Sequence, residues 1–166
     1  MNSCKIDNKF LYSHSLFGGL TESELEEIKT YFKEERYKAG EIILHESEPN
    51  NRIFFIISGN VSIIKTREQS QKGENEHADD IVVLSQFTSG DTFGEMELID
   101  IQPCAASVRA DTETVAYTFT NNDLYKLSKW NLKTHTMIIM NLAREISRRL
   151  RIANEALSHE LFKDQG

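Results

Sequence analysis

The chain has 166 residues, of which 39% are hydrophobic and 27% charged, and its net charge is −7. This length suits one domain with an appendage, and the composition is that of a soluble globular protein. The acidic balance argues against binding of nucleic acid over the whole surface. No apolar run is long enough to span a bilayer and no signal peptide begins the chain, so a cytoplasmic location is expected.

Residues 1–34 are expected to form an N-terminal helical segment. Thr21 and Glu24 have the spacing of a capping box, which predicts a helix from Thr21 to about Phe32. The apolar face of this helix is expected to carry Leu25, Ile28 and Phe32. Nothing in this segment indicates catalysis.

Residues 35–120 have the pattern of a β domain. Short runs rich in isoleucine, valine and phenylalanine alternate with turn signals such as Gly40, Pro49 and Gly59. The runs expected to be strands are 36–38, 40–45, 52–58, 60–65, 81–84, 107–110 and 114–119. Brief strands at this spacing predict a sandwich, barrel or jelly roll. The polar segment 66–80 is expected to be a mobile surface loop.

Residues 121–166 are predicted to be helical. Asn121 or Asn122 is expected to cap a short helix over 123–129, which Trp130 and Asn131 interrupt. A longer helix should then extend to about residue 162, with an apolar stripe of Ile139, Leu142, Ile146, Leu150, Ala153, Leu157 and Leu161. Some 30 residues make a helix of roughly 45 Å, more than this domain can cover.

Part of that stripe therefore needs another partner. A second copy of the chain, pairing through residues 131–162, is the expected one, which predicts a homodimer. The alternative is a helix broken near Ala153 whose end folds back as a lid. An arginine cluster on the helix (Arg144, Arg148, Arg149 and Arg151) is interpreted as a solvated face, because Glu145 can pair with Arg149.

Residues 90–108 have the local pattern of an anion-binding turn. Gly90 and Asp91 predict a turn, Phe93 closes a short apolar strand, and Gly94 permits a close backbone approach where a brief helical turn begins. The free amides at such a helix start favour an anion. The helical turn is expected to end before Pro103, where a strand of small residues resumes.

Phe93-Gly94-Glu95-Met96-Glu97-Leu98, followed by Pro103-Cys104-Ala105-Ala106-Ser107-Val108, resembles the phosphate-binding cassette of the cyclic nucleotide-binding domain family. The usual pattern there is F-G-E-L-A-L, a short spacer, then P-R-A-A-S/T-V. Segments 40–44 and 54–63 also resemble the family's first strands, with Ser47 where the family often has glycine. The family includes catabolite activator proteins and regulatory subunits of protein kinase A. The resemblance implies an antiparallel β jelly roll, or double-stranded β-helix, with N-terminal helices and a long C-terminal helix.

The resemblance also implies a ligand site for a cyclic nucleotide. Its expected residues are Phe93, Gly94, Glu95, Met96, Leu98, Cys104, Ala105, Ala106 and Ser107. Glu95 matches the family's ligand to the ribose 2′-hydroxyl, and Ser107 matches a residue near the phosphate and base. Ala105 resembles members that bind cAMP, since members that prefer cGMP tend to carry threonine there.

Two residues depart from the cassette pattern. Cys104 replaces the arginine that holds the cyclic phosphate, a charge-assisted contact worth roughly 1.5 to 3 kcal/mol per bond. Glu97 adds a negative charge where the family usually has alanine. Two functions therefore stay open: a cyclic nucleotide sensor, for cAMP before cGMP, that moves the C-terminal helices, or a degenerate relative that works through protein contacts and dimerisation. In the sensor, an arginine of the long helix is a hypothetical substitute for the missing one.

Other classes fit less well. A metal-dependent jelly-roll enzyme needs clustered imidazoles, whereas His14, His45, His77, His135 and His159 are scattered, so neither catalysis nor a metal or cofactor is expected. The chain offers no room for a helix-turn-helix after the long helix, which disfavours a direct transcription factor. Cys4 and Cys104 have no metal or redox spacing. Cys104 is read as a small strand residue, with a reactive thiol as the alternative.

Overall fold

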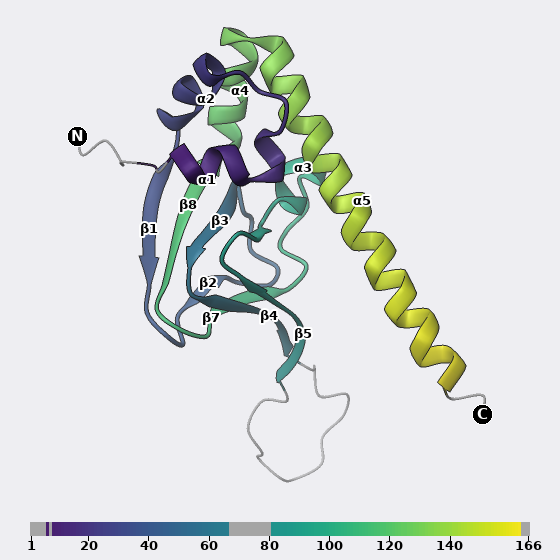
Figure 1. Cartoon of the computed structure of the whole chain (residues 1–166). Coiled ribbons are helices and arrows are strands. Elements are labelled where there is room, and N and C mark those ends of the chain that lie inside the picture. Colours follow the sequence, from purple (N-terminus) through teal and green to yellow (C-terminus); the bar gives the residue numbers. More distant parts are fainter. Residues whose placement is uncertain (1–5, 7, 67–80, 164–166) are drawn as a thin grey trace. The chain divides into compact units, whose positions relative to one another are not determined.

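The computed structural model describes residues 6, 8–66 and 81–163 (Figure 1). These residues form two compact units, one comprising Tyr31–Asp123 and the other combining the N-terminal helices with the chain from Leu124 onward. The surface loop expected at 66–80 lies, apart from Thr66, outside the described residues.

The first unit is built from eight described strands, which lie at β1 (Lys33–Tyr37), β2 (Ile42–Leu44), β3 (Arg52–Ser58), β4 (Asn60–Thr66), β5 (Ile81–Thr88), β6 (Thr92–Phe93), β7 (Ser107–Ala110) and β8 (Thr114–Thr120). One sheet has the order β1-β8-β3-β6 and the other the order β2-β7-β4-β5, with every pairing antiparallel. The predicted fold, mainly β and antiparallel with flanking helices and a long C-terminal helix, is confirmed as a sandwich of two sheets. β5 extends four residues beyond the run expected from the sequence.

The core of this unit lies between the two sheets. Phe54, Ile56, Val61, Phe93 and Val108 are among its buried members. β3 is buried on both faces, because the ring of Phe55 packs on the far side against Phe32, with ring centroids 5.3 Å apart. A strand covered on both sides has a continuous apolar run rather than an alternating one. The sequence of β3, in which five apolar residues follow Arg52 without a break, has this pattern.

The turn between β3 and β4 requires glycine. Gly59 has φ +93°, and a Cβ there would lie 2.5 Å from the carbonyl oxygen of Glu113. No other residue type fits a left-handed position this close to another strand's backbone. The glycine turn expected from the sequence therefore lies directly against the start of β8.

The helices lie at α1 (Asn8–Ser13), a 3₁₀ turn η1 (Ser15–Phe17), α2 (Glu22–Lys29), α3 (Met96–Asp100), α4 (Asn121–Trp130) and α5 (Leu132–Lys163). The capping box of α2 is confirmed, with the Thr21 and Glu24 side chains each bonded to the other's backbone amide. α1 and η1 lie within the helical segment expected over residues 1–34, although the sequence did not indicate their individual bounds. None of the described helices has both the length and the apolar character to cross a bilayer.

The expected cap of α4 is wrong. Neither Asn121 nor Asn122 caps it, because the Thr120 hydroxyl accepts the amide of Asp123, at 3.1 Å, and Asp123 accepts the amide of Thr120. This is the reciprocal arrangement of a capping box, and it starts the helix at the last residue of β8. The break at Asn131 is confirmed, since its side-chain oxygen caps α5 through the amides of Lys133 and Thr134.

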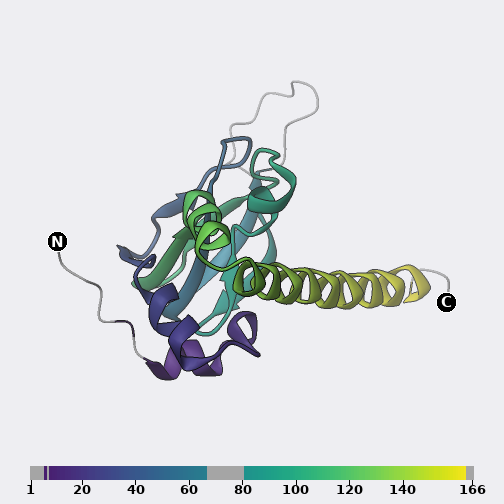
Figure 2. The same cartoon turned by 90° about the horizontal axis from the view of Figure 1, so that it is seen from above.

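α5 is one helix of 32 residues, which at about 1.5 Å per residue is roughly 48 Å long. Figure 2 shows it as one unbroken helix. The alternative of a break near Ala153 is therefore wrong. Within its own unit the first half of α5 packs on η1, and the Asn141 side-chain amide donates to the carbonyls of Leu16 and Gly18, both at 2.9 Å. Ile138 and Leu142 are buried there, whereas every residue from Arg151 to Lys163 is exposed.

Candidate functional site

The cassette connects β6 to β7 through α3, and its close backbone approach occurs at Gly94. This residue has φ +76°, and a Cβ there would lie 2.8 Å from the carbonyl oxygen of Arg52 and 2.9 Å from the Asn50 amide nitrogen. The Asn50 side chain donates to the carbonyls of both Arg52 and Gly94, at 2.7 and 3.1 Å. The glycine therefore lets the turn before β3 tie directly to the start of α3.

A second contact joins the same turn to the far end of the cassette. The Cys104 amide donates to the Glu48 carbonyl and the Ser47 amide donates to the Cys104 carbonyl, both at 2.9 Å. The Ser107 hydroxyl accepts the amide of Glu46, at 2.9 Å. The cassette and the segment from Glu46 to Arg52 thus form one hydrogen-bonded structure.

Backbone strain lies at both parts of this structure. Among the described residues, Ser47 (φ 65°) and Ile101 (φ 58°) are the non-glycine positions with positive φ. Such conformations cost of order 1 kcal/mol or more and concentrate at ligand sites. Ser47 stands where the family resemblance leads us to expect glycine. Ile101 ends α3 within the cassette.

The sequence-predicted site residues fall into different environments. Phe93 is buried in the core and stacks on Phe54, with centroids 4.7 Å apart, so its ring supports the sheet. Leu98 is also buried, and Glu95 is only 5% exposed at the start of α3. Met96 and Ala105 are exposed, and Ala106 and Ser107 are half-buried.

Cys104 and Glu97 lie side by side where the resemblance expects the cyclic phosphate. Cys104 is 3% exposed, and its burial, reinforced by the charge of Glu97, raises the pKa of the thiol to about 11. This direction favours the neutral thiol and is opposite to the lowered pKa that a reactive thiolate needs. Atom Oε2 of Glu97 is buried and receives no hydrogen bond from the part of the chain that the structure describes.

A small cavity opens beside Cys104. Its volume is about 140 Å³, and it is bounded by Cys104, β2 and the turn into β3, with His45, Glu48, Asn50 and Arg52 as its polar lining. The Arg52 guanidinium is held there by Glu35, with Nη1 2.8 Å from Oε1. The sequence alone did not indicate these residues, because the Pro49-Asn50-Asn51 signal identifies a turn but not what packs against it.

The raised pKa of Cys104 predicts a loss of stability in alkali. The folded chain keeps the thiol proton up to about pH 11, whereas the unfolded chain loses it near its ordinary pKa of 9.0. Unfolding therefore releases a proton in this window, and the free energy of unfolding should fall by about 1 to 2 kcal/mol as the pH rises from 9 toward 11. Urea unfolding at several pH values measures this fall.

Cys104→Ala is the control for this pH dependence. Tyr37 also has a raised pKa, because it is buried and donates a hydrogen bond to Glu35, so both proteins should lose some stability in alkali. The unaltered chain should lose more. Equal losses in the two proteins would contradict the assignment to Cys104.

Comparison with known proteins places this geometry in a family. A family model described as the cyclic nucleotide-binding domain matches residues 34–130. A CRP-like cAMP-activated global transcriptional regulator from Mycobacterium tuberculosis is 27% identical over 157 residues, covering 95% of this chain and 64% of the regulator. The chain spans about a fifth of the length of the curated kinase regulatory subunits that it matches.

Solved structures share the fold. A cyclic nucleotide-binding domain from Methylobacillus flagellatus has a TM-score of 0.77 at 21% identity, covering 92% of this chain and 80% of that one. The regulatory subunit of a cAMP-independent protein kinase A from Trypanosoma brucei has a TM-score of 0.66 at 18% identity, covering 82% and 44%. That structure is of a mutant bound to cAMP in the A site. A glutamate is replaced by alanine, a threonine seven residues later by arginine, and the valine after it by alanine.

Proposed function

Because this chain belongs to the cyclic nucleotide-binding domain family, we propose that it is a regulatory module that binds a nucleoside-type ligand through residues 93–108 and signals through its C-terminal helices. Among cyclic nucleotides it favours cAMP over cGMP, since Ala105 matches the members that bind cAMP. Its affinity for the cyclic phosphate itself is low. The ligand that fits best offers the base and the ribose hydroxyls without that negative charge.

The observation that carries this proposal is the pair formed by Glu97 and Cys104. A neutral thiol supplies no positive charge, and a carboxylate beside it repels a phosphate in a setting of reduced dielectric. The buried Oε2 of Glu97 needs a hydrogen-bond donor, and an unmet buried acceptor costs about 1 to 3 kcal/mol. A hydroxyl or amino group of the ligand meets that need, whereas an anion does not.

The remainder of the cassette supports a retained ligand site. Gly94 keeps its left-handed conformation, Glu95 stays at the start of α3 and Ser107 keeps its place on β7. Ser47 has positive φ in the turn that bonds the Cys104 carbonyl, and backbone costs of this kind concentrate at ligand sites. These features favour a site with changed preference over a cassette kept only for packing.

The variant from Trypanosoma brucei supports the same proposal. Its first two substitutions are separated by seven residues, as Glu97 and Cys104 are here, and they remove a glutamate and introduce an arginine. Its third substitution introduces an alanine next to that arginine, where this chain has Ala105. The parallel in spacing and chemistry suggests that the same two positions control cAMP binding in this chain.

Signal transfer is proposed to run through α4. This helix starts at the capping box of Thr120 and Asp123, within the β unit, and continues as far as Trp130. A ligand changes the populations of two helix arrangements only if it binds the protein more tightly in one arrangement than in the other. Such a shift is expected at the α4 start, which follows β8 without a linker.

A second candidate function is favoured by the exposed half of α5. Leu150, Leu157 and Leu161 are each close to 60% exposed, and contiguous exposed apolar residues mark protein contacts. In this alternative the chain is a homodimerisation module, with α5 as its contact. Dimerisation and ligand binding are compatible, so the two functions are tested separately.

Calorimetric titration with cAMP, cGMP and adenosine tests the ligand proposal. Adenosine carries the base and ribose of cAMP without the phosphate. We expect adenosine to bind more tightly than cAMP, and cAMP more tightly than cGMP. Tight cAMP binding with weak adenosine binding would contradict the role given to Glu97 and Cys104. If none of the three binds, the ligand-binding proposal fails and the dimerisation module remains.

A further inference from the structure

The first half of α5 carries a shallow hollow with an apolar floor. It has a volume of about 510 Å³ and is lined by Leu132, Lys133, Thr136, Met137, Met140 and Arg144. Leu132 is 67% exposed and Met140 is 48% exposed, although both side chains are large and apolar. Methionine is flexible and polarizable, and it is frequent at surfaces that bind other proteins. We call this surface the methionine hollow.

The methionine hollow lies on a side of α5 that the contacts described above do not use. With 3.6 residues per turn, Met140 and Arg144 each lie about 160° around the helix axis from Leu142, which is buried against the N-terminal helices. The exposed Leu150 and Leu157 lie on a third side, about 60° to 80° from Leu142. The hollow is therefore distinct both from the packed face of α5 and from the exposed leucines of its second half.

A cation lies at each end of the methionine hollow. Lys133 and Arg144 are 11 residues apart, which is about three helical turns, so they lie on the same side of α5 and roughly 16 Å apart along its axis. The Arg144 guanidinium donates to the Asn141 side-chain oxygen at 2.7 Å. Asn141 is itself fixed by its bonds to the carbonyls of Leu16 and Gly18. This contact holds the guanidinium in place without neutralising its charge.

Neither of these two cations forms an ion pair with any residue that the structure describes. Glu24 is within electrostatic reach of Lys133, but its carboxylate already accepts hydrogen bonds from Thr21 and Thr134. Lys133 and Arg144 are therefore available to the carboxylates of a partner.

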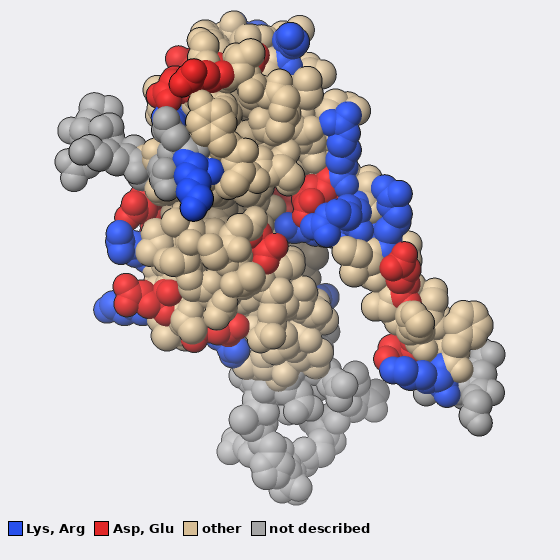
Figure 3. All heavy atoms as spheres, in the orientation of Figure 1, with Lys and Arg blue, Asp and Glu red and all other residues tan. Residues whose placement is uncertain are grey.

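The sequence around the hollow contains no acidic residue. Residues 124–144 include four basic residues and neither Asp nor Glu, whereas an even spread of the chain's 26 acidic residues would place about three there. Figure 3 shows basic side chains gathered along the middle of α5. This part of the surface attracts anionic groups, although the chain as a whole has a net charge of −7.

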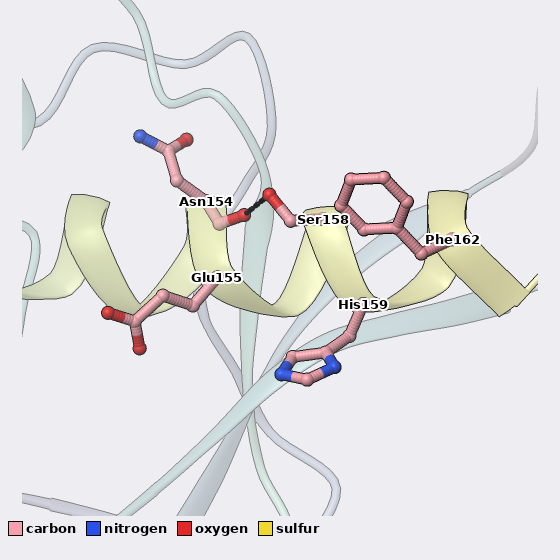
Figure 4. A pocket seen from close by; sticks show the side chains of 5 residues that line it. All are labelled: Asn154, Glu155, Ser158, His159 and Phe162. Carbon is pink, nitrogen blue, oxygen red and sulfur yellow. Dashed lines mark hydrogen bonds between the residues drawn. The ribbon is translucent and has the colours of Figure 1, made fainter.

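A second hollow lies along the end of α5 and has a different charge. Asn154, Glu155, Ser158, His159 and Phe162 line it, and the Ser158 hydroxyl is turned back to the Asn154 carbonyl at 2.8 Å (Figure 4). Its lining includes one carboxylate and neither Lys nor Arg. An acidic partner is therefore expected at the methionine hollow and not at this one, so the end of α5 supplies the control variants.

We infer that the methionine hollow binds an acidic amphipathic helix of another protein, with apolar side chains on Met137 and Met140 and carboxylates at Lys133 and Arg144. A helix fits because its own residues 11 positions apart recur on one side at the same spacing of roughly 16 Å. Amphipathic helices bind apolar grooves through one face in this way. The inference goes beyond the ligand site and the dimerisation alternative and depends on neither.

Two synthetic helical peptides test the inference with the full chain. Both have about 18 residues and leucines at steps of three and four, and they differ in carrying either glutamates or lysines at the two ends of the leucine face. Fluorescence anisotropy should show that the glutamate peptide binds about tenfold more tightly or better, with an affinity that falls as salt is added. Equal binding of the two peptides, or tighter binding of the lysine peptide, would overturn the inference.

Variants of the hollow locate the contact. Lys133→Glu/Arg144→Glu should reverse the preference, because the lysine peptide then meets two carboxylates, and Met140→Ala should weaken the glutamate peptide several-fold. Lys163→Glu and Phe162→Ala are the matched controls at the end of α5, and they should change affinity by less than about twofold. Equal effects of the hollow variants and the controls, with helix content intact by circular dichroism, would place the contact elsewhere and overturn the inference.

Other anionic partners are distinguished in the same assay. Vesicles of phosphatidylserine and phosphatidylcholine and a single-stranded oligonucleotide are titrated beside the peptides. Binding of either one without binding of the glutamate peptide would overturn the inference in favour of a phosphate-bearing partner. The adenosine titration does not involve this surface, so its outcome is independent. Light scattering, which gives 19.1 kDa for a monomer and twice that mass for a dimer, tests the dimerisation alternative separately.

Discussion

The double variant Cys104→Arg/Glu97→Ala should bind cAMP about 100-fold more tightly than the unaltered chain, or better. Two charge-assisted bonds from a guanidinium to a phosphate are worth roughly 3 kcal/mol or more together, and each 1.4 kcal/mol is about tenfold in affinity. Removal of the Glu97 carboxylate also ends its electrostatic repulsion of the cyclic phosphate. Calorimetric titration of the two proteins measures the gain.

The site has room and partners for the new side chain. Cys104 borders the cavity of about 140 Å³, whose lining includes Glu48. Glu48 is one of the charges that already act on the Cys104 thiol, so it lies within electrostatic reach of an arginine there. The negative charge of Glu48 helps to position a guanidinium at residue 104 and reduces the free-energy cost of burying it.

Cys104→Met is the matched control, because it adds length without charge. It should leave cAMP affinity unchanged, and Glu97→Ala alone should raise it by a smaller factor than the double variant. The affinity for adenosine should fall when Glu97 is replaced, because the buried Oε2 of Glu97 is the proposed acceptor of a hydrogen bond from the ligand. An unchanged cAMP affinity in the double variant, with the fold intact by circular dichroism, would contradict this account of the cassette.

Phe54→Ala should remove about 3 to 5 kcal/mol from the free energy of unfolding. The Phe54 side chain is fully buried and stacks on Phe93, with an interplanar angle of 3°. Its ring also lies 5.0 Å below the Arg52 guanidinium, which borders the candidate site. The truncation therefore leaves a cavity and loosens two groups beside the cassette. Urea unfolding measures the loss.

Phe162→Ala is the matched control for this truncation. The ring of Phe162 is 74% exposed at the end of α5, so its removal should change stability by less than about 0.5 kcal/mol. Similar losses for the two variants would show that the core of the β unit does not determine stability in the way described here.

The elements that the sequence predicted best are those governed by local rules. The capping box at Thr21 and the turn at Gly59 depend on residues close in the chain or on a backbone angle that only glycine adopts easily. The strands were recognisable from their apolar pattern, and the cassette from two motifs in the right order. The Glu145 and Arg149 ion pair followed from helical spacing and is present at 3.0 Å.

The elements that the sequence missed depend on competing local choices or distant partners. Thr120, Asn121 and Asn122 are adjacent, and each is a residue type that often caps a helix N-terminus. Thr120 is the cap of α4 because β8 ends there and the helix begins at the next residue. The N-terminal helical segment was expected as a whole, but the bounds of α1 were not, because a six-residue helix is too short for a periodic signal. β5 continues to Thr88 because β4 supplies its backbone partners as far as Asn60.

The sequence by itself determined the class of fold, the position of the cassette, the loss of its arginine and the length of the last helix. Each of these depends on residue identity or on spacing along the chain. Only the tertiary structure decided that Glu97 and Cys104 meet, that the turn at residues 46–52 is hydrogen-bonded to the cassette, and which leucines of α5 stay exposed. The turn at residues 46–52 is joined to the cassette by contacts between residues 44 and 61 positions apart, and the exposure of the leucines is a matter of burial. Glu97 and Cys104 are only seven positions apart, but the end of α3 lies between them, and spacing along the chain does not say that their side chains meet.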